Sequence, residues 1–284
     1  MMAHTVSQPL TLEPKYYEAS HLALVKNTQD KDLSILKEFK PHSLAQQNTA
    51  ALMNRVDSKY LLPIALFNPL MKAISADYSI LTAYGQRIFN YQTTYFDNKR
   101  RQFFHDHHNG KLNRYKVRFR RYVESATGYM EVKLKNNQKR TIKQRIPMDC
   151  ILPNQARVND FVKKTLGYEV TLETVLFVNY QRITLLNKTN LERITIDLNL
   201  SFRNAKEQIQ SIQDKVFIVE IKQDRKPLPS TCRSFIKNHC YHDINFSKYC
   251  IGSVLTRNTN AEVQELKFNR FKPVLRQLER LNFQ

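Results

Sequence analysis

Glycine is scarce in this sequence, with only five among 284 residues, and tryptophan is absent. Neither of the two common glycine-rich phosphate patterns, GxxxxGK(S/T) and GxGxxG, occurs anywhere in the chain. Both patterns need glycine because the backbone must approach a phosphate group closely. The sequence therefore excludes a P-loop and a Rossmann nucleotide site.

Cysteine is also scarce and lacks the spacing of a metal or redox motif. The four cysteines, Cys150, Cys232, Cys240 and Cys250, form no CxxC pair, and three of them fall within one late region. This pattern favours reduced thiols in a cytosolic protein over a disulfide framework.

Long apolar runs are missing as well. No segment approaches the roughly 18 apolar residues that a membrane-spanning helix needs, and no basic stretch followed by an apolar run opens the sequence. We expect neither secretion nor an integral membrane segment, and we expect a cytoplasmic location.

What the sequence has in excess is positive charge. Lys and Arg total 45 against 25 Asp and Glu, which gives a net charge of +20, while hydrophobic residues still make up 42%. The apolar content predicts a folded core, and the charge predicts a polyanionic partner. Composition does not distinguish nucleic acid, an anionic membrane and an inorganic phosphate chain, because all three respond to the same potential.

The chain divides into an N-terminal arm, residues 1–40, and one large domain, residues 41–284. A helix is expected at 43–54. Period-2 alternation predicts strands at 55–61, 88–97, 112–123, 128–136, 175–186, 191–200 and 215–222. Helical patterns lie at 64–75, 154–166, 230–256 and 261–281. These elements predict an α+β protein whose antiparallel sheet either packs one face on helices or closes into a barrel.

The predicted strand at 112–123 carries a purely cationic face. Arg114, Lys116, Arg118 and Arg120 alternate with Tyr115, Val117 and Phe119. Like charges along one strand repel unless an anion offsets them, so this face indicates an anion site.

Other strands repeat the division into an apolar and a charged face. The charged sets are Asp57 and Lys59; Glu131, Lys133 and Lys135; Tyr180 and Arg182; Arg193 and Asp197; and Glu220 and Lys222. Periodicity does not say whether these faces point into a barrel or outward to water. Both arrangements remain open at this level.

Eight short motifs in order resemble those of VTC domains. They are RVDSKY at 55–60, YFD at 95–97, RFR at 118–120, EVK at 131–133, YQR at 180–182, RITID at 193–197, VEIK at 219–222 and SKY at 247–249. Their order and spacing agree with the family from about residue 50 to residue 256. Where relatives usually carry Glu two residues before the lysine of the first motif, this chain has Asp57, whose role is left open.

The resemblance implies a fold and an activity. The family belongs with the triphosphate tunnel metalloenzymes, or CYTH-like proteins, whose antiparallel barrels have a basic lumen and helices packed outside. VTC domains transfer the γ-phosphoryl group of ATP to a growing inorganic polyphosphate chain, with a divalent cation such as Mn²⁺ or Mg²⁺. The resemblance therefore implies ATP and polyphosphate as partners, no nucleic acid, and a free-standing enzyme of prokaryotic type.

The resemblance also implies site residues. The catalytic phosphate contacts would be Lys59, Arg118, Arg120, Lys133, Arg182, Arg193 and Lys248. Substrate binding would add Tyr180, as a hydrogen-bond donor, together with Lys222, Ser247, Arg114 and Lys116. Glu220 would be the metal ligand, whereas Asp57, Glu131 and Asp197 could bind metal or pair with a neighbouring cation.

Two other function classes stay open. A tunnel protein of this kind could hydrolyse triphosphates or nucleotides, or it could bind polyanions without catalysis. The sequence does not fix the direction of phosphoryl transfer.

Three further signals receive simpler explanations. We expect His105, His107 and His108 in an exposed turn. Because the spacing of Cys232, His239, Cys240 and His242 matches no closed zinc site, we expect buried thiols and surface histidines there. We expect the basic segment 261–281 to cover the barrel with its apolar stripe rather than to bind an acidic partner.

Overall fold

The protein is built around one curved antiparallel sheet. The computed structural model describes residues 33–49, 55–138, 140–149, 154–212, 215–224, 229–257 and 266–282. The main hydrogen-bonded path runs in the order β2-β11-β9-β8-β4-β5-β6-β7. The strands are β2 (Arg55–Pro63), β4 (Phe89–Asp97), β5 (Arg114–Tyr122), β6 (Thr127–Lys135), β7 (Thr141–Met148), β8 (Glu173–Asn187), β9 (Arg193–Asn204) and β11 (Val216–Asp224).

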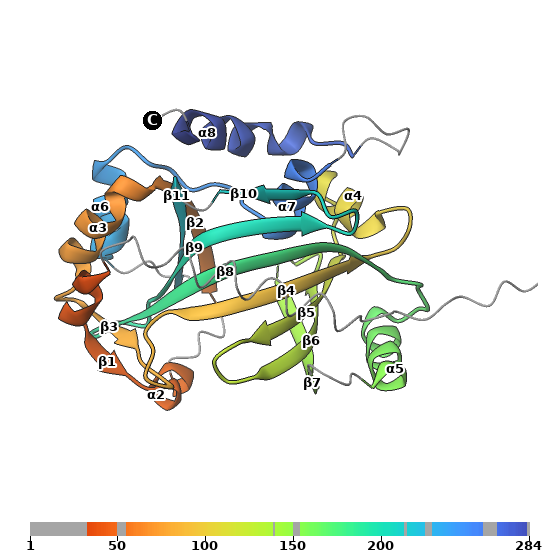
Figure 1. Ribbon diagram of the computed structural model, residues 1–284, viewed down its shortest axis with the longest axis horizontal. Coiled ribbons are helices and arrows are strands. Elements are labelled where there is room, and N and C mark those ends of the chain that lie inside the picture. Colours follow the sequence, from red (N-terminus) through yellow and green to blue (C-terminus); the bar gives the residue numbers. More distant parts are fainter. Residues whose placement is uncertain are drawn as a thin grey trace, which may run out of the picture.

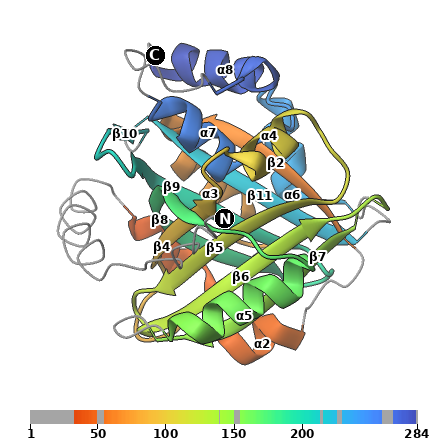
Figure 2. The same cartoon turned by 90° about the vertical axis from the view of Figure 1, so that its right-hand side faces the viewer.

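Three short strands extend this path at its edges. β1 (Lys40–His42) pairs with β3 (Tyr78–Leu81), which pairs with β8, and β10 (Ile209–Ser211) pairs with β9. Figures 1 and 2 show the sheet curling so that β2 and β11 face β5, β6 and β7 across a central space. No backbone pairing joins β7 to β2 within the described ranges. The predicted α+β tunnel architecture is confirmed, as a strongly curved sheet rather than a ring closed by hydrogen bonds.

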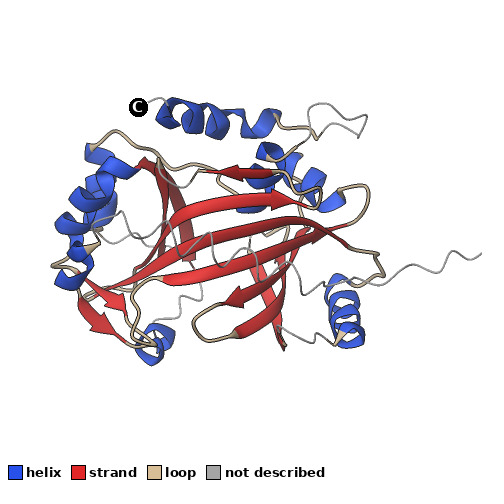
Figure 3. Cartoon of the chain, in the orientation of Figure 1, coloured by secondary structure: helices blue, strands red, loops and turns tan. Residues whose placement is uncertain are grey.

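Helices cover the apolar outer face of the sheet (Figure 3). α5 (Gln155–Leu166) packs Val158, Val162 and Leu166 against Val117 of β5 and Val132 of β6. On the other side, α3 (Phe67–Ile74) and α6 (Thr231–Asn238) cover the outer side chains of β9 and β11. Since the apolar faces are covered from outside, the charged faces of the same strands turn inward.

One end of the interior is closed by apolar packing. α7 (Lys248–Leu255) and α8 (Lys272–Asn282) share a hydrophobic cluster with Val216 and Ile218 of β11. Val216, Ile218, Glu220 and Lys222 follow one another at two-residue intervals along β11. Their side chains therefore share one face of the strand, which points inward. The inner face is thus polar along part of its length and apolar beneath α7 and α8.

The helical expectations near the C-terminus are partly corrected. Instead of one helix at 230–256, α6 and α7 are separated by residues 239–247, which contain no helix. Of the segment 261–281, the described part starts at residue 266 and forms η3 (Asn269–Phe271) and α8. Phe271, Val274 and Leu278 are buried against the sheet cluster, so the predicted covering role of this segment is confirmed.

Besides the short strands β1, β3 and β10, two elements were not predicted. The histidine segment is not an exposed turn but the helix α4 (Gln102–His108). This helix begins there because the Asp97 carboxylate accepts hydrogen bonds from the amides of Phe103 and Phe104, each at 2.9 Å. β7 was also missed, because its residues TIKQRIPM carry little apolar alternation and a proline.

The N-terminal expectations lie largely on residues 1–32, which are outside the described part of the chain. Within it, η1 (Ser34–Glu38) buries Leu36 and is followed by the buried Phe39. The helix expected at 43–54 is observed as α2 (Leu44–Thr49), and residues 50–54 are not described. η2 (Ile64–Leu66) leads into α3. In the described part, no helix has the length and apolar character needed to cross a bilayer.

Candidate functional site

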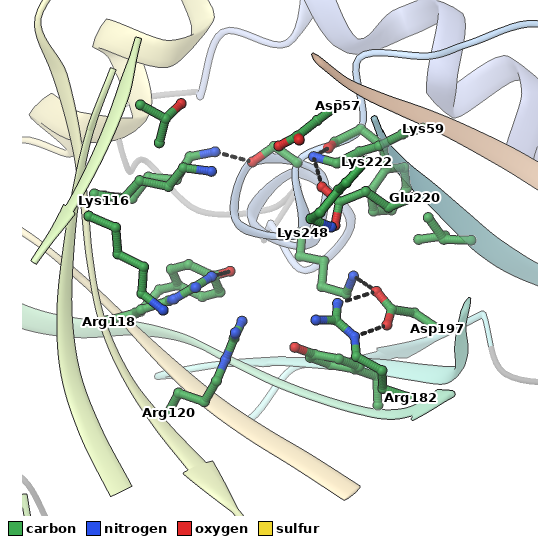
Figure 4. A pocket seen from close by; sticks show the side chains of 18 of the residues that line it. Asp57, Lys59, Lys116, Arg118, Arg120, Arg182, Asp197, Glu220, Lys222 and Lys248 are labelled. Carbon is green, nitrogen blue, oxygen red and sulfur yellow. Dashed lines mark hydrogen bonds and ion pairs between the residues drawn. The ribbon is translucent and has the colours of Figure 1, made fainter. Parts of the chain in front are cut away.

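The charged inner faces enclose a cavity of about 820 Å³. Eleven cationic and three acidic side chains line it, together with Tyr95, Tyr180, Thr141, Ile142, Ile218, Phe246 and Ser247. The cations are Lys59, Lys116, Arg118, Arg120, Lys133, Arg140, Lys143, Arg182, Arg193, Lys222 and Lys248, and the acids are Asp57, Asp197 and Glu220. Figure 4 shows Lys116, Arg118 and Arg120 on one wall facing Arg182, Asp197, Glu220 and Lys222 on the other.

The structure brings nearly all of the predicted residues to this one cavity. Of the thirteen site residues inferred from the sequence, only Arg114 is outside its lining, and Arg114 lines an adjoining pocket. Strand register explains the convergence: on the antiparallel pair β5 and β6, Lys116 lies opposite Lys133 and Arg118 lies opposite Glu131. The alternation that gave these strands a charged face therefore also builds a wall of the cavity.

Glu131 holds two cations on one wall. The Arg118 guanidinium donates to its carboxylate, with Nε at 2.7 Å and Nη2 at 2.6 Å, and Lys143 pairs with its other oxygen. Only 1% of the Glu131 side chain is exposed. Burial alone would raise the pKa of Glu131, but Arg118, Arg120 and Lys143 hold it well below its usual range. Glu131 is therefore an ion-pair partner in this structure.

Asp197 performs the same role on the opposite wall. Arg182 Nε donates to Oδ1 at 2.6 Å and Arg182 Nη2 donates to Oδ2 at 2.9 Å, while Lys248 also pairs with Oδ2. Burial opposes ionisation of Asp197, yet Arg182 and Lys248 lower its pKa. Arg182 and Lys248 are thus held in fixed positions by a carboxylate that is itself shielded from water.

Glu220 lies between two lysines. Its carboxylate pairs with Lys222 and lies 3.7 Å from Lys59 Nζ. Burial opposes its ionisation, but Lys222, Lys59 and Arg182 hold the pKa of Glu220 well below its usual range. Glu220 is therefore ionised and available to a cation at any ordinary pH.

The acidic side chains of the cavity are too few for a closed metal site but fit an ion shared with phosphate. Within the described part of the chain, no group of three His, Cys, Asp or Glu side chains could hold a metal ion. Glu220 and Asp57 line the same cavity from the neighbouring strands β11 and β2. One or two carboxylates fit a hard cation that takes its other oxygens from phosphate and water. The residues fit a shared metal–phosphate site and do not form a closed protein site.

Apart from the exposed Arg140, three cations of the cavity have no carboxylate partner within 4.0 Å among the described residues: Lys116, Arg120 and Lys133. Lys116 Nζ donates to the Ser247 hydroxyl at 3.0 Å. Arg120 makes a long hydrogen bond of 3.4 Å to Thr93 and lies 5.5 Å from the ring centre of Tyr91. Burial, followed by repulsion from neighbouring cations, lowers the pKa of Lys133 to about 7 and that of Lys116 to about 8.

Tyr180 presents an unsatisfied hydroxyl to the same space. The residue is fully buried, lines the cavity, and its hydroxyl has no hydrogen-bond partner within the described structure. Its ring stacks on Tyr91 at 5.1 Å between centroids, and Lys248 Nζ lies 4.6 Å from its centre. An orphan buried donor is costly unless a ligand accepts from it, which agrees with the predicted role of Tyr180.

The start of α7 supplies the remaining predicted groups. Ser247 caps this helix by accepting from the Cys250 amide at 3.3 Å, and Lys248 follows it into the cavity. Lys59 Nζ donates to the carbonyl of Phe246 at 3.2 Å. Strand β2 and the loop before α7 are thus joined at the cavity wall.

Sequence reasoning missed Arg140 and Lys143, because β7 was not predicted. The signal in the sequence was polar and not apolar: Lys143 and Arg145 alternate in β7, which follows β6 after a short turn containing Asn136 and Asn137, and Arg140 stands directly before the strand. Of the late cysteine cluster, Cys232 is buried but Cys240 is exposed, so the expectation of buried thiols is wrong for Cys240. His239 and His242 are exposed as expected, whereas Cys150 lies outside the described residues.

A family model described as the VTC domain matches residues 54–257. The search of curated proteins found no match. Among solved structures, a candidate adenylate cyclase from Vibrio parahaemolyticus is 9% identical with a TM-score of 0.43, covering 71% of this chain and 99% of its own. The adenylyl cyclase candidate HpAC1 from Hippeastrum, described as having a dominant triphosphatase activity, is 12% identical with a TM-score of 0.43, covering 73% and 98%. At these scores the structural likenesses carry no inference about substrate.

Proposed function

Because the chain belongs to the VTC domain family, we propose that it is a polyphosphate polymerase. In this proposal the γ-phosphoryl group of ATP is transferred to the end of an inorganic polyphosphate chain inside the basic cavity, and ADP is released. The observation that supports it most directly is the set of three cations, Lys116, Arg120 and Lys133, without a carboxylate partner.

The electrostatics of these cations favour a bound anion. Buried charges are normally paired or lose their charge by a pKa shift. The lowered pKa values of Lys116 and Lys133 show the cost of leaving them without a counterion. A chain of phosphates carries closely spaced negative charges and would offset several of these cations at once.

The different roles that these residues can take suit phosphoryl transfer. This reaction needs little covalent chemistry from the protein and depends on positioning and on stabilising charge. Arg118 and Arg182, fixed by Glu131 and Asp197, would align phosphates with their planar guanidinium groups. Arg120, Lys116 and Lys133 would supply uncompensated charge, and Tyr180 would donate a hydrogen bond to a phosphate oxygen.

A divalent cation, Mn²⁺ or Mg²⁺, is part of the proposal. Glu220, with Asp57 beside it, would hold the ion, which when bound would neutralise charge on the phosphate oxygens. The lysines next to Glu220 would then turn to phosphate oxygens that share the same space.

The test is incubation of the purified protein with ATP and Mn²⁺, with long-chain polyphosphate resolved from orthophosphate by gel electrophoresis. We expect polyphosphate and ADP to form. Glu220→Gln and Arg120→Ala should each lower the rate by about 10²-fold or more, as expected when one preorganised charge is removed from a transition state. Arg276→Ala is the matched control, because Arg276 is exposed on α8 and lines neither pocket.

Mutation of Arg120 tests the proposed activity more cleanly than mutation of Arg118. Arg118 is also the bidentate partner of the buried Glu131, so its removal would weaken folding as well as binding. Arg120 has no such partner among the described residues, and its loss should spare the fold.

Two results would contradict the polymerase. Release of orthophosphate without a polymer would make the protein a hydrolase. Tight binding of polyphosphate or duplex DNA, with no turnover of ATP in any divalent metal, would make it a binding module.

A further inference from the structure

A second, smaller pocket of about 200 Å³ adjoins the cavity. It shares Lys59, Lys116 and Lys133 with the cavity lining and continues beyond them to Arg114, Lys135 and Arg270. We call this whole second pocket, including the three shared lysines, the annex. Its lining contains six cations and a single acid, Asp57, so the positive character of the cavity continues into it.

Two arginines from distant parts of the chain meet in the annex. Arg114 begins β5, and Arg270 lies in η3 directly before α8. Neither has a carboxylate within 4.0 Å among the described residues. Burial, and then the charge of Arg270, lower the pKa of Arg114. Two guanidinium groups that repel each other without a counterion form a site that an anion would stabilise.

Arg270 is exposed, and its Nη1 donates a long hydrogen bond of 3.4 Å to the carbonyl of His108. The Arg270 guanidinium lies against the backbone at Gly110, where an added Cβ would be 2.2 Å from Arg270 Nη1. Gly110 also has a φ of +70°, a backbone conformation that favours glycine. The absence of a side chain at Gly110 therefore makes room for Arg270.

Arg114 is positioned by a neutral histidine. Its Nε donates to His107 Nδ1 at 3.1 Å, and the other ring nitrogen of His107 lies 3.2 Å from the carbonyl of Tyr115. These contacts require the proton on His107 Nε2. Burial, with Lys116 and Arg114 nearby, lowers the pKa of His107 to about 2, so the imidazole remains an acceptor for Arg114.

We propose that the annex is a second phosphate-chain subsite, which holds the part of a polyphosphate chain that extends out of the cavity, with Arg114 and Arg270 as its principal contacts. The proposal rests on the proposed function for the identity of the ligand. Arg270 lies beyond residues 54–257 that the family model matches, so the family match does not account for this contact. Its chemistry is recognition of linear phosphate by paired guanidinium groups.

The test compares a short and a long ligand by isothermal titration calorimetry on the full chain. The proposal places tripolyphosphate within the cavity and extends long-chain polyphosphate into the annex. We expect Arg270→Ala to weaken long-chain binding by about five- to tenfold, the low end for a hydrogen bond to a charged group, and to change tripolyphosphate binding by less than about twofold. Arg276→Ala should change neither.

A second variant, Arg114→Gln, probes the other side of the annex and should reproduce the selective loss of long-chain affinity. Equal loss of affinity for both ligands in Arg270→Ala would overturn the subsite. An Arg270→Ala protein that binds long-chain polyphosphate as tightly as Arg276→Ala does would also overturn it. So would displacement of the long chain by an equal concentration of orthophosphate, which would indicate a site for single ions. Because binding requires no turnover, selective loss in a protein that makes no polyphosphate would support the subsite while refuting the polymerase.

Discussion

At the scale of single residues, Asp197 decides the geometry of one cavity wall. It is 2% exposed and holds both Arg182 and Lys248. We expect Asp197→Asn to lower the free energy of unfolding by about 3–5 kcal/mol, because removing one partner of a buried ion pair leaves the others uncompensated. Urea unfolding followed by circular dichroism would measure the loss.

The same variant separates a structural carboxylate from a metal ligand. A phosphate ligand should replace the missing negative charge, so tripolyphosphate should stabilise Asp197→Asn more than it stabilises the wild type. Asp160→Asn is the control, because its pair with Lys164 on α5 is exposed on both sides and should contribute less than about 1 kcal/mol. Equal stabilisation of the wild type and Asp197→Asn by tripolyphosphate, combined with a changed metal requirement, would favour the metal-ligand role for Asp197.

Lys133 predicts a pH dependence for phosphate binding. Its pKa is lowered to about 7 by burial and by Lys116 and Lys59, and a bound phosphate would raise it again. Below pH 7 the amine is already protonated, so binding takes up no proton there. Above pH 7 binding must take up a proton, and affinity should fall by up to about tenfold per pH unit for each such group.

Proton uptake is measurable by titrating tripolyphosphate at pH 8 in two buffers of different ionisation enthalpy. We expect net uptake in the wild type, with a smaller uptake in Lys133→Arg, whose guanidinium stays protonated. Lys116 and Lys222, with pKa values lowered to about 8 chiefly by burial, should keep some uptake in that variant. Absence of uptake in the wild type would show that these lysines are charged before the ligand arrives.

At the scale of secondary structure, α7 couples the core to the site. It carries Ser247 and Lys248 at its start, and its Gly252 packs directly on Phe202 and Leu176. A Cβ at Gly252 would lie 2.4 Å from a ring carbon of Phe202. Helix propensity favours alanine over glycine by about 1 kcal/mol, but overpacking of a core costs about 1–3 kcal/mol.

We therefore expect Gly252→Ala to destabilise the protein by up to about 2 kcal/mol. We also expect weaker tripolyphosphate binding, because moving α7 away from β8 and β9 displaces Ser247 and Lys248. Thermal unfolding and calorimetry on the same preparation would measure both effects. A stability gain would show that α7 has room to move without cost.

The elements that the sequence predicted share one property, a regular apolar period. β5 and β6 alternate apolar and charged residues, and α5 has an apolar stripe, so their positions follow from local pattern. β7 has no such pattern, and its place is set by pairing with β6. α4 depends on Asp97, a carboxylate that also binds the distant Tyr249 of α7. Non-local partners of this kind leave no periodic signal in the sequence.

At the scale of the whole molecule, the excess of cations gives a ligand effect on stability. A ligand that binds only the folded state at 100 times its dissociation constant adds about 2.7 kcal/mol. For a domain of this size we expect tripolyphosphate at that excess to raise Tm by about 5–10 °C. The shift should shrink in 0.5 M NaCl at the same ligand concentration, because salt screens the attraction.

Differential scanning fluorimetry would record this shift, with Arg120→Ala as the comparison. That variant should unfold near the wild-type Tm without ligand and show a smaller shift with it. An unchanged shift in Arg120→Ala would place the phosphate away from the cavity.

The sequence by itself determined which residues carry charge and which strand faces they occupy, and it predicted a polyanionic partner. These properties depend on composition and on the period-2 geometry of a strand, which act locally. Only the tertiary structure decided that the charged faces of β2, β5, β6, β8, β9 and β11 point into one cavity. It also decided which carboxylates form ion pairs with arginines and which cations have no carboxylate partner among the described residues. Curvature of the sheet and the docking of helices outside it are collective results of packing, so no single segment specifies them.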